Sequence, residues 1–221
     1  MMDISFAYLY RLKVANKYLL VKNSRNTGKY QPVGGVYQLT ENEKLYLKNR
    51  FQVKDDDKIL IDESSKNDYR LRMENTYLRS FMRRFNGRAE RETINDISRE
   101  FKEELVDAGI LNWTQIKYRF CGRYMTELRY EEHFQIFELQ LSDVVELIPS
   151  IEQERDLLNL MRMSSEKYKF ATASEIASLG IDTTSGNLVE SIGDHTKRIL
   201  EETENELLKI KDTGKVFSVS L

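Results

Sequence analysis

Two kinds of hydrophobic periodicity alternate along this chain of 221 residues, and their alternation limits the fold more than any other feature. Alternating apolar and polar residues predict half-buried strands, whereas apolar residues three and four apart predict amphipathic helices. The strand-like segments are 4–14, 17–22, 29–37, 116–124 and 134–141, and the helix-like segments are 77–85, 94–108, 150–163, 173–179 and 187–210. Since strands and helices interleave, we predict an α/β fold with a mixed β-sheet.

Short signals mark the ends of several of these segments. Ala15-Asn16 separates the first two strands and is typical of a hairpin turn. Thr93 and Asp96 resemble a capping box ahead of the helix at 94–108, and Gly109 stands where such a helix often ends. Residues 215–221 fit either a short strand or a disordered end.

Composition and charge exclude several classes of protein. Lys and Arg number 34 against 36 Asp and Glu, and a net charge of −2 argues against a general nucleic-acid-binding protein. One cysteine excludes an internal disulfide, and two histidines far apart in sequence argue against a histidine metal site. No apolar run approaches the roughly 18–20 residues of a membrane span, and the N-terminus lacks a secretory signal pattern. We therefore expect a cytoplasmic protein that does not bind membranes.

The helix expected over 94–108 carries a cluster of carboxylates. Glu100, Glu103 and Glu104 are three and four residues apart, so they share one edge of the helix. Like charges at this spacing destabilise a helix, and Mg²⁺ would reverse the effect because it prefers carboxylate oxygens. The alternative interpretation is a solvated acidic face.

The same helix resembles a known motif. Residues 99–105 read REFKEEL and match the core of the Nudix box, G-x5-E-x7-R-E-U-x-E-E-x-G-U, and residues 31–35, QPVGG, resemble the P-x-G-G strand end that precedes this box. Residues 169–179 resemble the last strand and helix of that family. The resemblance implies an α/β/α sandwich around a mixed sheet. It also implies catalytic and metal-binding roles for Glu100, Glu103 and Glu104, with Mg²⁺ or Mn²⁺ as the ion, and structural roles for Arg99, Gly34 and Gly35.

The sequence departs from the Nudix box in three places. Gly109 follows Glu104 after four residues instead of one. Residues 36–86 replace a short loop ahead of the box. Arg91 stands eight residues before Arg99, where the box has a glutamate that usually braces the arginine, although acidic residues flank Arg91 on both sides.

A narrower resemblance accounts for the long insertion. Residues 4–23, 30–37, 67–85 and 91–105 look like the SMODS-associated Nudix domains, which accompany bacterial cyclic-oligonucleotide synthases in antiphage signalling operons. The likeness extends from residue 4 to about residue 180. We therefore expect a Nudix domain over 1–182, with a helical insertion at about 38–86 before the Nudix helix. A C-terminal helical extension would then occupy 183–221.

The insertion carries a basic segment that could bind phosphate. Residues 69–91 contain seven arginines against two glutamates. The planar guanidinium group donates two parallel hydrogen bonds to phosphate oxygens, which makes Arg70, Arg72 and Arg83 the candidate substrate-binding residues. The alternative is an amphipathic helix over 77–85 whose arginines are merely solvated.

Two functions stay open at this stage. In the first, the protein uses Mg²⁺ to hydrolyse a nucleoside diphosphate-linked or related nucleotide, and the intact 99–104 motif favours this function. In the second, it is a non-catalytic nucleotide sensor of an antiphage signalling system, which Arg91 and the insertion favour. A further loop carboxylate could complete the site, and Glu131, Glu132, Glu152 and Glu154 are eligible. The helix expected at 187–210 could form a homodimer seam, bind another protein or fold back on its own domain.

Overall fold

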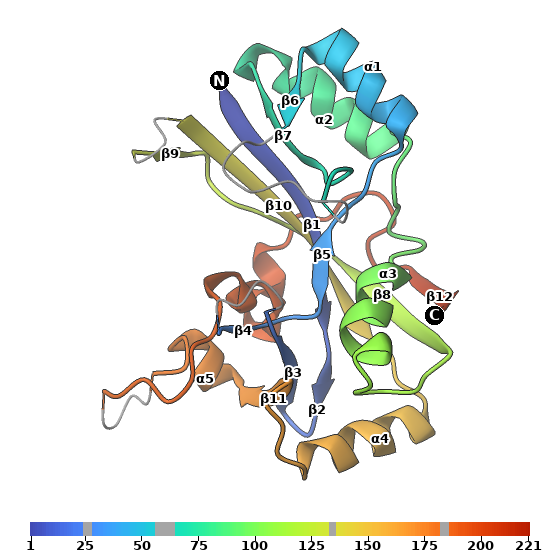
Figure 1. Cartoon of the computed structure of the whole chain (residues 1–221), viewed down its shortest axis with the longest axis vertical. Helices are drawn as coiled ribbons and strands as arrows, with labels where there is room; N and C mark the ends of the chain where they lie inside the picture. The colour runs from blue at the N-terminus through green and yellow to red at the C-terminus, as the bar shows by residue number, and fades with distance from the viewer. Residues whose placement is uncertain (24–27, 56–64, 133–135, 182–185) are drawn as a thin grey trace. The chain divides into compact units, whose positions relative to one another are not determined.

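The computed structural model describes residues 1–23, 28–55, 65–132, 136–181 and 186–221. They form two compact units, whose elements are labelled in Figure 1. The first comprises Met1–Tyr8, Gly35–Ile94 and Met125–Ser142, and the second comprises Leu9–Gly34, Asn95–Tyr124 and Asp143–Leu221. Three strands run from one unit into the other along the chain: β1 (Met2–Arg11), β8 (Gln115–Met125) and β10 (Ile136–Leu147). The mixture of sheets and helices confirms the predicted α/β class.

The first unit is built on an antiparallel sheet. β1 pairs with β7 (Arg70–Met73), and β7 pairs with β6 (Lys54–Asp55). β5 (Gly34–Val36) also pairs with β1, and β9 (Arg129–Glu131) pairs with β10. The strand predicted at 134–141 begins outside the described residues, as does His133, and is observed as β10 from Ile136 onward.

Two helices complete the first unit. α2 (Leu78–Gly87), preceded by the 3₁₀ turn η1 (Asn75–Tyr77), confirms the helix predicted at 77–85. Its apolar side buries Phe81 and Phe85, and Phe85 stacks on Phe6 of β1 with ring centroids 3.7 Å apart. α1 (Glu41–Phe51) was not predicted. Arg84 of α2 joins the two helices by a bidentate pair with the buried Glu43, at 3.0 and 2.5 Å.

The second unit contains a smaller sheet. β11 (Tyr168–Thr172), β3 (Lys17–Lys22) and β2 (Lys13–Val14) follow one another, and β4 (Tyr30–Gln31) pairs with β3. Ala15 and Asn16 have φ of 46° and 60° between β2 and β3, which confirms the predicted hairpin turn. β12 (Val216–Ser220) pairs with β8, so residues 215–221 form the strand rather than a disordered end.

The helices of the second unit begin at clear signals. α4 (Ile151–Met161) and α5 (Ala173–Ala177) each follow a complete capping box, at Ser150 and Thr172 respectively. The helix predicted from residue 94 is observed as α3 (Ser98–Phe101) continued by the π-helix η2 (Lys102–Asp107).

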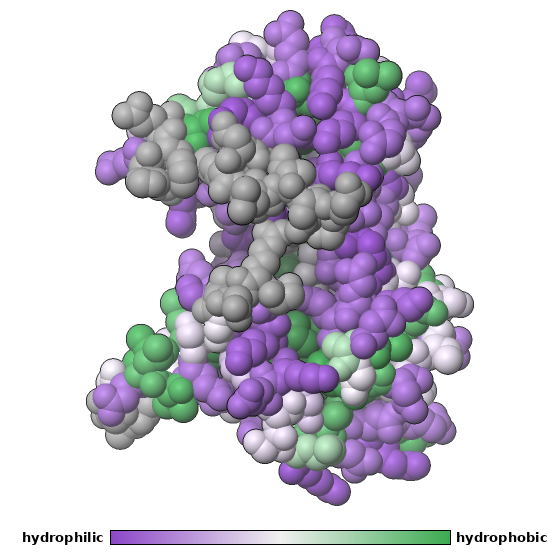
Figure 2. Space-filling view, viewed as in Figure 1, coloured by the Kyte–Doolittle hydropathy of each residue, from purple (hydrophilic) through white to green (hydrophobic). Residues whose placement is uncertain are grey.

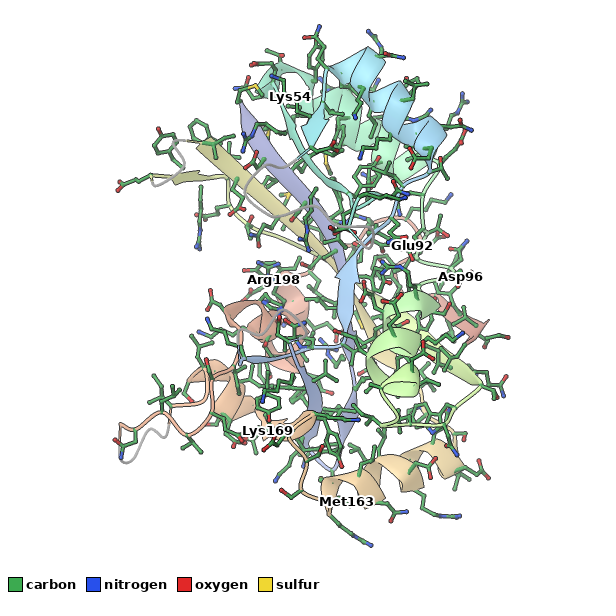
Figure 3. The ribbon with its side chains drawn as sticks, in the orientation of Figure 1. Lys54, Glu92, Asp96, Met163, Lys169 and Arg198 are labelled. Carbon is green, nitrogen blue, oxygen red and sulfur yellow. The ribbon has the colours of Figure 1, made fainter. Side chains whose placement is uncertain are left out.

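The predicted capping box of that helix is wrong. Thr93 does not cap it, because the helix begins only at Ser98 and has no side-chain cap. Asp96, labelled in Figure 3, instead accepts a hydrogen bond from the Ser98 hydroxyl at 3.0 Å. The hydroxyl of Tyr10 donates to the carbonyl of Ile97 at 2.9 Å, so the residue before the helix is held by β1.

The long C-terminal helix predicted at 187–210 is also wrong. The segment forms two short 3₁₀ helices, η3 (Asp194–Ile199) and η4 (Glu201–Glu206). Leu200 between them is extended, with φ −65° and ψ 143°. The carbonyls of Ile199 and Leu200 accept hydrogen bonds from Arg11 of β1, at 2.6 and 3.0 Å, so a distant side chain holds the junction between the two 3₁₀ helices.

The surface is mainly hydrophilic on the face shown in Figure 2, in keeping with 32% charged residues. Among the described residues, no helix combines the length and apolar character needed to cross a bilayer. A pocket of about 740 Å³ in the second unit lies between the end of η2 and α4, where Trp113, Asp156 and Met163 line it. None of the candidate glutamates borders this pocket.

Candidate active site

The segment that carries the three glutamates is anchored through its apolar side. Ile97, Phe101 and Leu105 are completely buried. Phe101 stacks on Trp113, with ring centroids 5.9 Å apart, and contacts Tyr10 edge-on at 5.3 Å. Because this side is fixed in the core, the opposite edge with the glutamates is turned away from it.

Glu103 and Glu104 lie in the π-helical segment η2 rather than in an α-helix. π-helical turns are rare and occur frequently at functional sites. The segment ends at Gly109, whose φ of 70° is in the left-handed region that glycine adopts most readily, as the sequence predicted. Lys167 donates to the carbonyl of Ala108 at 2.8 Å and so satisfies one of the last carbonyls.

Glu104 is held by two hydrogen-bond donors. The backbone N–H of Gly34 donates to its Oε2 at 3.0 Å, and the side-chain amide of Gln31 donates to the same carboxylate. Gly34 has φ 147°, a conformation that side chains disfavour, which explains a glycine at this position. Asn23 donates to Oε1 of Gln31 at 2.6 Å, so the NH₂ group of Gln31 is left to face Glu104.

The environment of Glu104 disfavours its charged form. The pKa of Glu104 is raised to about 8, chiefly by burial; the nearby Glu100 and Glu103 carboxylates add to the rise, and the two hydrogen bonds oppose it. A carboxyl group with a pKa near neutrality exchanges protons readily at physiological pH. Perturbed groups of this kind are concentrated at functional sites.

Arg99 and Glu100 form an ion pair on the same helix. Arg99 Nη1 lies 2.5 Å from Glu100 Oε1, and their side chains are 23% and 17% exposed. Glu103 is exposed. Across the described ranges, no group of three or more acidic, histidine or cysteine side chains converges as a metal site.

The candidate arginines belong to the first unit, whereas the glutamates belong to the second. Arg72 is engaged by the buried Asp3, with Nε–Oδ1 and Nη2–Oδ2 distances of 2.8 and 3.3 Å. Arg70 lies 3.7 Å from Asp68. Arg83 is exposed on α2, so its guanidinium is the most accessible of the three.

Arg91, which replaces the usual glutamate of the box, is a structural residue of the first unit. Its guanidinium lies 3.6 Å from the ring centroid of Phe85 and 4.7 Å from that of Tyr37. It also donates to the backbone carbonyls of Phe85 and Glu92. Among the loop carboxylates, Glu152 and Glu154 lie in the first turn of α4.

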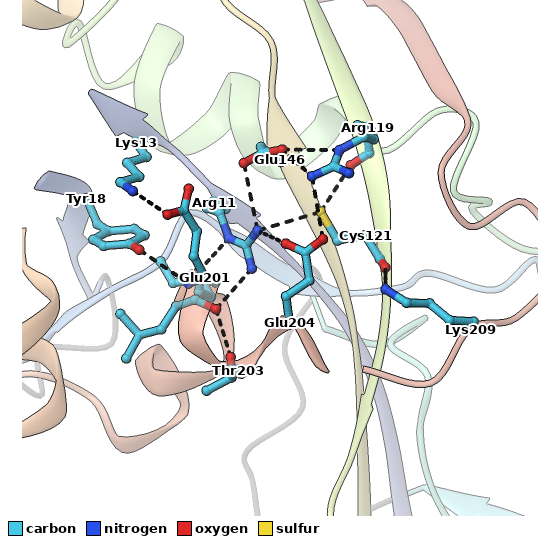
Figure 4. A network of polar contacts seen from close by, with 12 residues as sticks. Arg11, Lys13, Tyr18, Arg119, Cys121, Glu146, Glu201, Thr203, Glu204 and Lys209 are labelled. Atoms are coloured by element: carbon cyan, nitrogen blue, oxygen red, sulfur yellow. Dashed lines mark hydrogen bonds and ion pairs between the residues drawn. The ribbon is translucent and has the colours of Figure 1, made fainter. Parts of the chain in front are cut away.

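Sequence reasoning missed a buried cation. Arg11 is completely buried and, besides its two backbone acceptors, pairs with Glu204 at 2.6 Å (Figure 4). Arg119 lies 2.7 Å from Glu146 and 3.6 Å from Glu204, and Lys13 pairs with Glu201. The sequence did contain a signal, a lone arginine within the apolar run of β1. Such an arginine is expected to be buried, and a buried charge is almost always paired with an opposite charge.

Comparison with known proteins identifies the family. The profile of the SMODS-associated NUDIX domain matches residues 2–200. No curated protein and no solved structure matches the chain significantly. The match includes the REFKEEL segment, the glycines at 34 and 35, the whole insertion and η3, and it ends just before η4. The chain therefore belongs to the SMODS-associated NUDIX domain family.

Proposed function

We propose that this protein hydrolyses a diphosphate linkage in a nucleotide with the help of a divalent cation. The observation that carries the proposal is Glu104, a carboxyl group held by Gly34 and Gln31 beside two other glutamates, with a pKa of about 8. The ionised form of such a group is a stronger base than an ordinary carboxylate and can accept a proton from water near neutral pH. Membership of a Nudix family supports nucleotide-related chemistry.

The carboxylates fit Mg²⁺ or Mn²⁺ in their chemistry. Mg²⁺ is commonly bound by one or two protein carboxylates, with waters and substrate phosphates completing its coordination, so three preassembled ligands are not required. Glu104 and Glu103 would hold the ion, and Glu100 would join them by exchanging its contact with Arg99. Such an ion, when bound, polarises a phosphoryl oxygen and lowers the pKa of water.

The other roles fall to residues of the chain itself. Gly34 and Gln31 fix one face of the Glu104 carboxylate, which leaves the remaining lone pairs for a water proton. Within the first unit, Arg83, Arg70 and Arg72 are the candidates for binding phosphate oxygens through paired hydrogen bonds. Of these, Arg72 would first have to release Asp3.

The test measures turnover and binding on the same samples. Wild type is incubated with nucleoside diphosphate derivatives, dinucleotides and cyclic oligonucleotides in Mg²⁺, and the products are separated by chromatography. Glu104→Gln should lower turnover by several orders of magnitude while metal-free nucleotide affinity stays within about tenfold, roughly 1.4 kcal/mol. Glu41→Gln, which changes an exposed glutamate in the first turn of α1, is the matched control. Cleavage that survives Glu103→Gln together with Glu104→Gln would contradict the site assignment.

A non-catalytic sensor is the second candidate. It is favoured by Arg91, whose guanidinium is engaged by Phe85 and Tyr37 where the Nudix box has a glutamate. In this function the protein binds a nucleotide signal in an antiphage system and transmits binding to a partner through its C-terminal segment. A thermal shift with one nucleotide, together with its complete recovery after long incubation in Mg²⁺, would establish the sensor and exclude the hydrolase.

A further inference from the structure

The outer edge of β12 is open for pairing. β12 is the last strand in the order of its sheet and lies beside β8 (Figure 1). Within the ranges that the structure describes, no other strand pairs with it. Natural proteins usually protect such an edge with charged residues, proline or a bulge. The sequence of β12, VFSVS, has none of these residues.

The hydrogen bonds to β8 show which groups of β12 point outward. Leu221 donates to the carbonyl of Thr114, and Phe120 donates to the carbonyl of Lys215, both at 2.9 Å. In an antiparallel pair, hydrogen-bonded positions alternate along the strand. The odd-numbered residues 215–221 therefore bond to β8, and the N–H and C=O groups of residues 216, 218 and 220 face away from it.

This outer edge is complementary to itself. A twofold axis through Ser218 places Ser218 opposite its own copy and Val216 opposite Ser220, so all three outward-facing residues find partners within the strand. The same register places Phe217 opposite Val219, which are both half-buried and would cover one another. Because the five residues carry no charge, no like charges come to lie opposite each other.

We propose that β12 pairs with β12 of a second copy of this chain, antiparallel and across a twofold axis through Ser218. The two sheets then become continuous through the edge of each copy. Val216, whose side chain is 45% exposed, becomes partly covered by Ser220 of the second copy. A second copy is the occupant because the outward N–H and C=O groups of residues 216, 218 and 220 pair with one another in this register, and the five residues carry no charge that would repel its copy.

The first test is the oligomeric state of the full chain, measured by sedimentation equilibrium over a range of concentrations. Ser218→Pro removes the central outward N–H but no bond to β8, so it should abolish dimerisation and leave the fold intact. Ser218→Thr keeps that N–H and should dimerise like wild type. A wild-type protein that stays monomeric at high concentration overturns the proposal, as does a dimer that survives Ser218→Pro.

The second test fixes the register and does not depend on the folding of the proline variant. Hydrogen-bonded antiparallel partners have Cα atoms about 5.5 Å apart, within the disulfide range, so Ser218→Cys should form an intermolecular disulfide under mild oxidation. Ser220→Cys has a similarly exposed side chain, yet its copy would lie four residues away along the strand, roughly 13 Å, and should not cross-link. The native Cys121 is buried. Cross-linking of Ser220→Cys without Ser218→Cys would overturn the register.

Discussion

Replacing Glu104 by glutamine should change how the stability of the protein depends on pH. The fold raises the pKa of this carboxyl group from 4.5 to about 8, so the folded state binds more protons than the unfolded chain between these values. The contribution of Glu104 to the free energy of unfolding is therefore fully present below pH 4.5 and declines as the pH rises towards about 8. Glutamine has no proton to lose, so the variant lacks this decline.

The size of the effect follows from the shift. At about 1.36 kcal/mol per pKa unit, this group should lower the free energy of unfolding of wild type by about 3 kcal/mol between pH 4 and pH 7, and solvent at the half-buried site reduces that figure. The glutamine variant has an opposing cost that does not depend on pH. Its NH₂ group would face the NH₂ of Gln31, whose orientation Asn23 fixes, and an unsatisfied donor costs about 1–3 kcal/mol. The slope, rather than the absolute difference, is therefore the quantity to measure.

The assay is urea unfolding at a series of pH values between about 4 and 8, without divalent cations. The stability difference between Glu104→Gln and wild type should move in favour of the variant as the pH rises. Asp107→Asn removes one negative charge from an exposed residue of the same segment and is the control for a general charge effect. If the difference in free energy of unfolding stays constant across this range, the pKa of Glu104 is not raised, and its proposed role as the proton acceptor is refuted.

Three further predictions concern the metal site and the ion pairs. Millimolar Mg²⁺ or Mn²⁺ should raise the melting temperature through preferential binding to the folded state, and Glu103→Gln should remove the gain in a thermal-shift assay. Arg99→Ala should lower the free energy of unfolding by about 1 kcal/mol, because it removes the partly exposed ion pair with Glu100, and it should also weaken nucleotide binding in titrations. Arg11→Met should cost about 3–5 kcal/mol in chemical denaturation and expose the segment after Ile199 to proteolysis, because Glu204 and the carbonyls of Ile199 and Leu200 lose the buried guanidinium that bonds to all three. A fully resistant C-terminal segment in that variant would show that Arg11 does not hold it.

Elements set by neighbouring residues were predictable from sequence. The hairpin at Ala15-Asn16 needs two residues with positive φ, and α4 needs only Ser150 with Gln153 three positions later. The extent of the family resemblance, from residue 4 to about 180, was close to the matched 2–200. In each case the stabilising contacts join residues close in sequence or belong to one continuous motif.

Elements set by distant residues were not predictable. Residues 187–210 have helical periodicity, but Arg11 donates hydrogen bonds to the carbonyls of Ile199 and Leu200 where the helix breaks. Arg11 lies 188 and 189 positions earlier in the sequence. Propensity alone carries no information about such contacts. α1 is different: besides the distant pair of Arg84 with Glu43, it begins at Thr40, whose hydroxyl caps Glu43 three positions later, and this local signal could have predicted it.

The candidate site was predictable only in its local part, the residues of the motif itself. The box motif identified Glu100, Glu103 and Glu104, because the motif is local and its glutamates are adjacent in sequence. It did not identify Gln31 of β4, whose amide donates to Glu104, or Asn23 just after β3, whose amide orients Gln31. The identities of these two residues matter only once β4 lies beside the Nudix helix.

The end of β1 links the candidate site to the C-terminal segment. Adjacent residues of a strand point to opposite faces, so Tyr10 and Arg11 serve different neighbours. Tyr10 bonds to Ile97 ahead of the glutamate-bearing helix and, through its backbone N–H, to the carbonyl of Val33 next to Gly34, at 2.9 and 2.8 Å. Arg11 holds the carbonyls of Ile199 and Leu200. A shift of the C-terminal segment that pulled on Arg11 would therefore act on the strand that positions both partners of the hydrogen bond between Gly34 and Glu104.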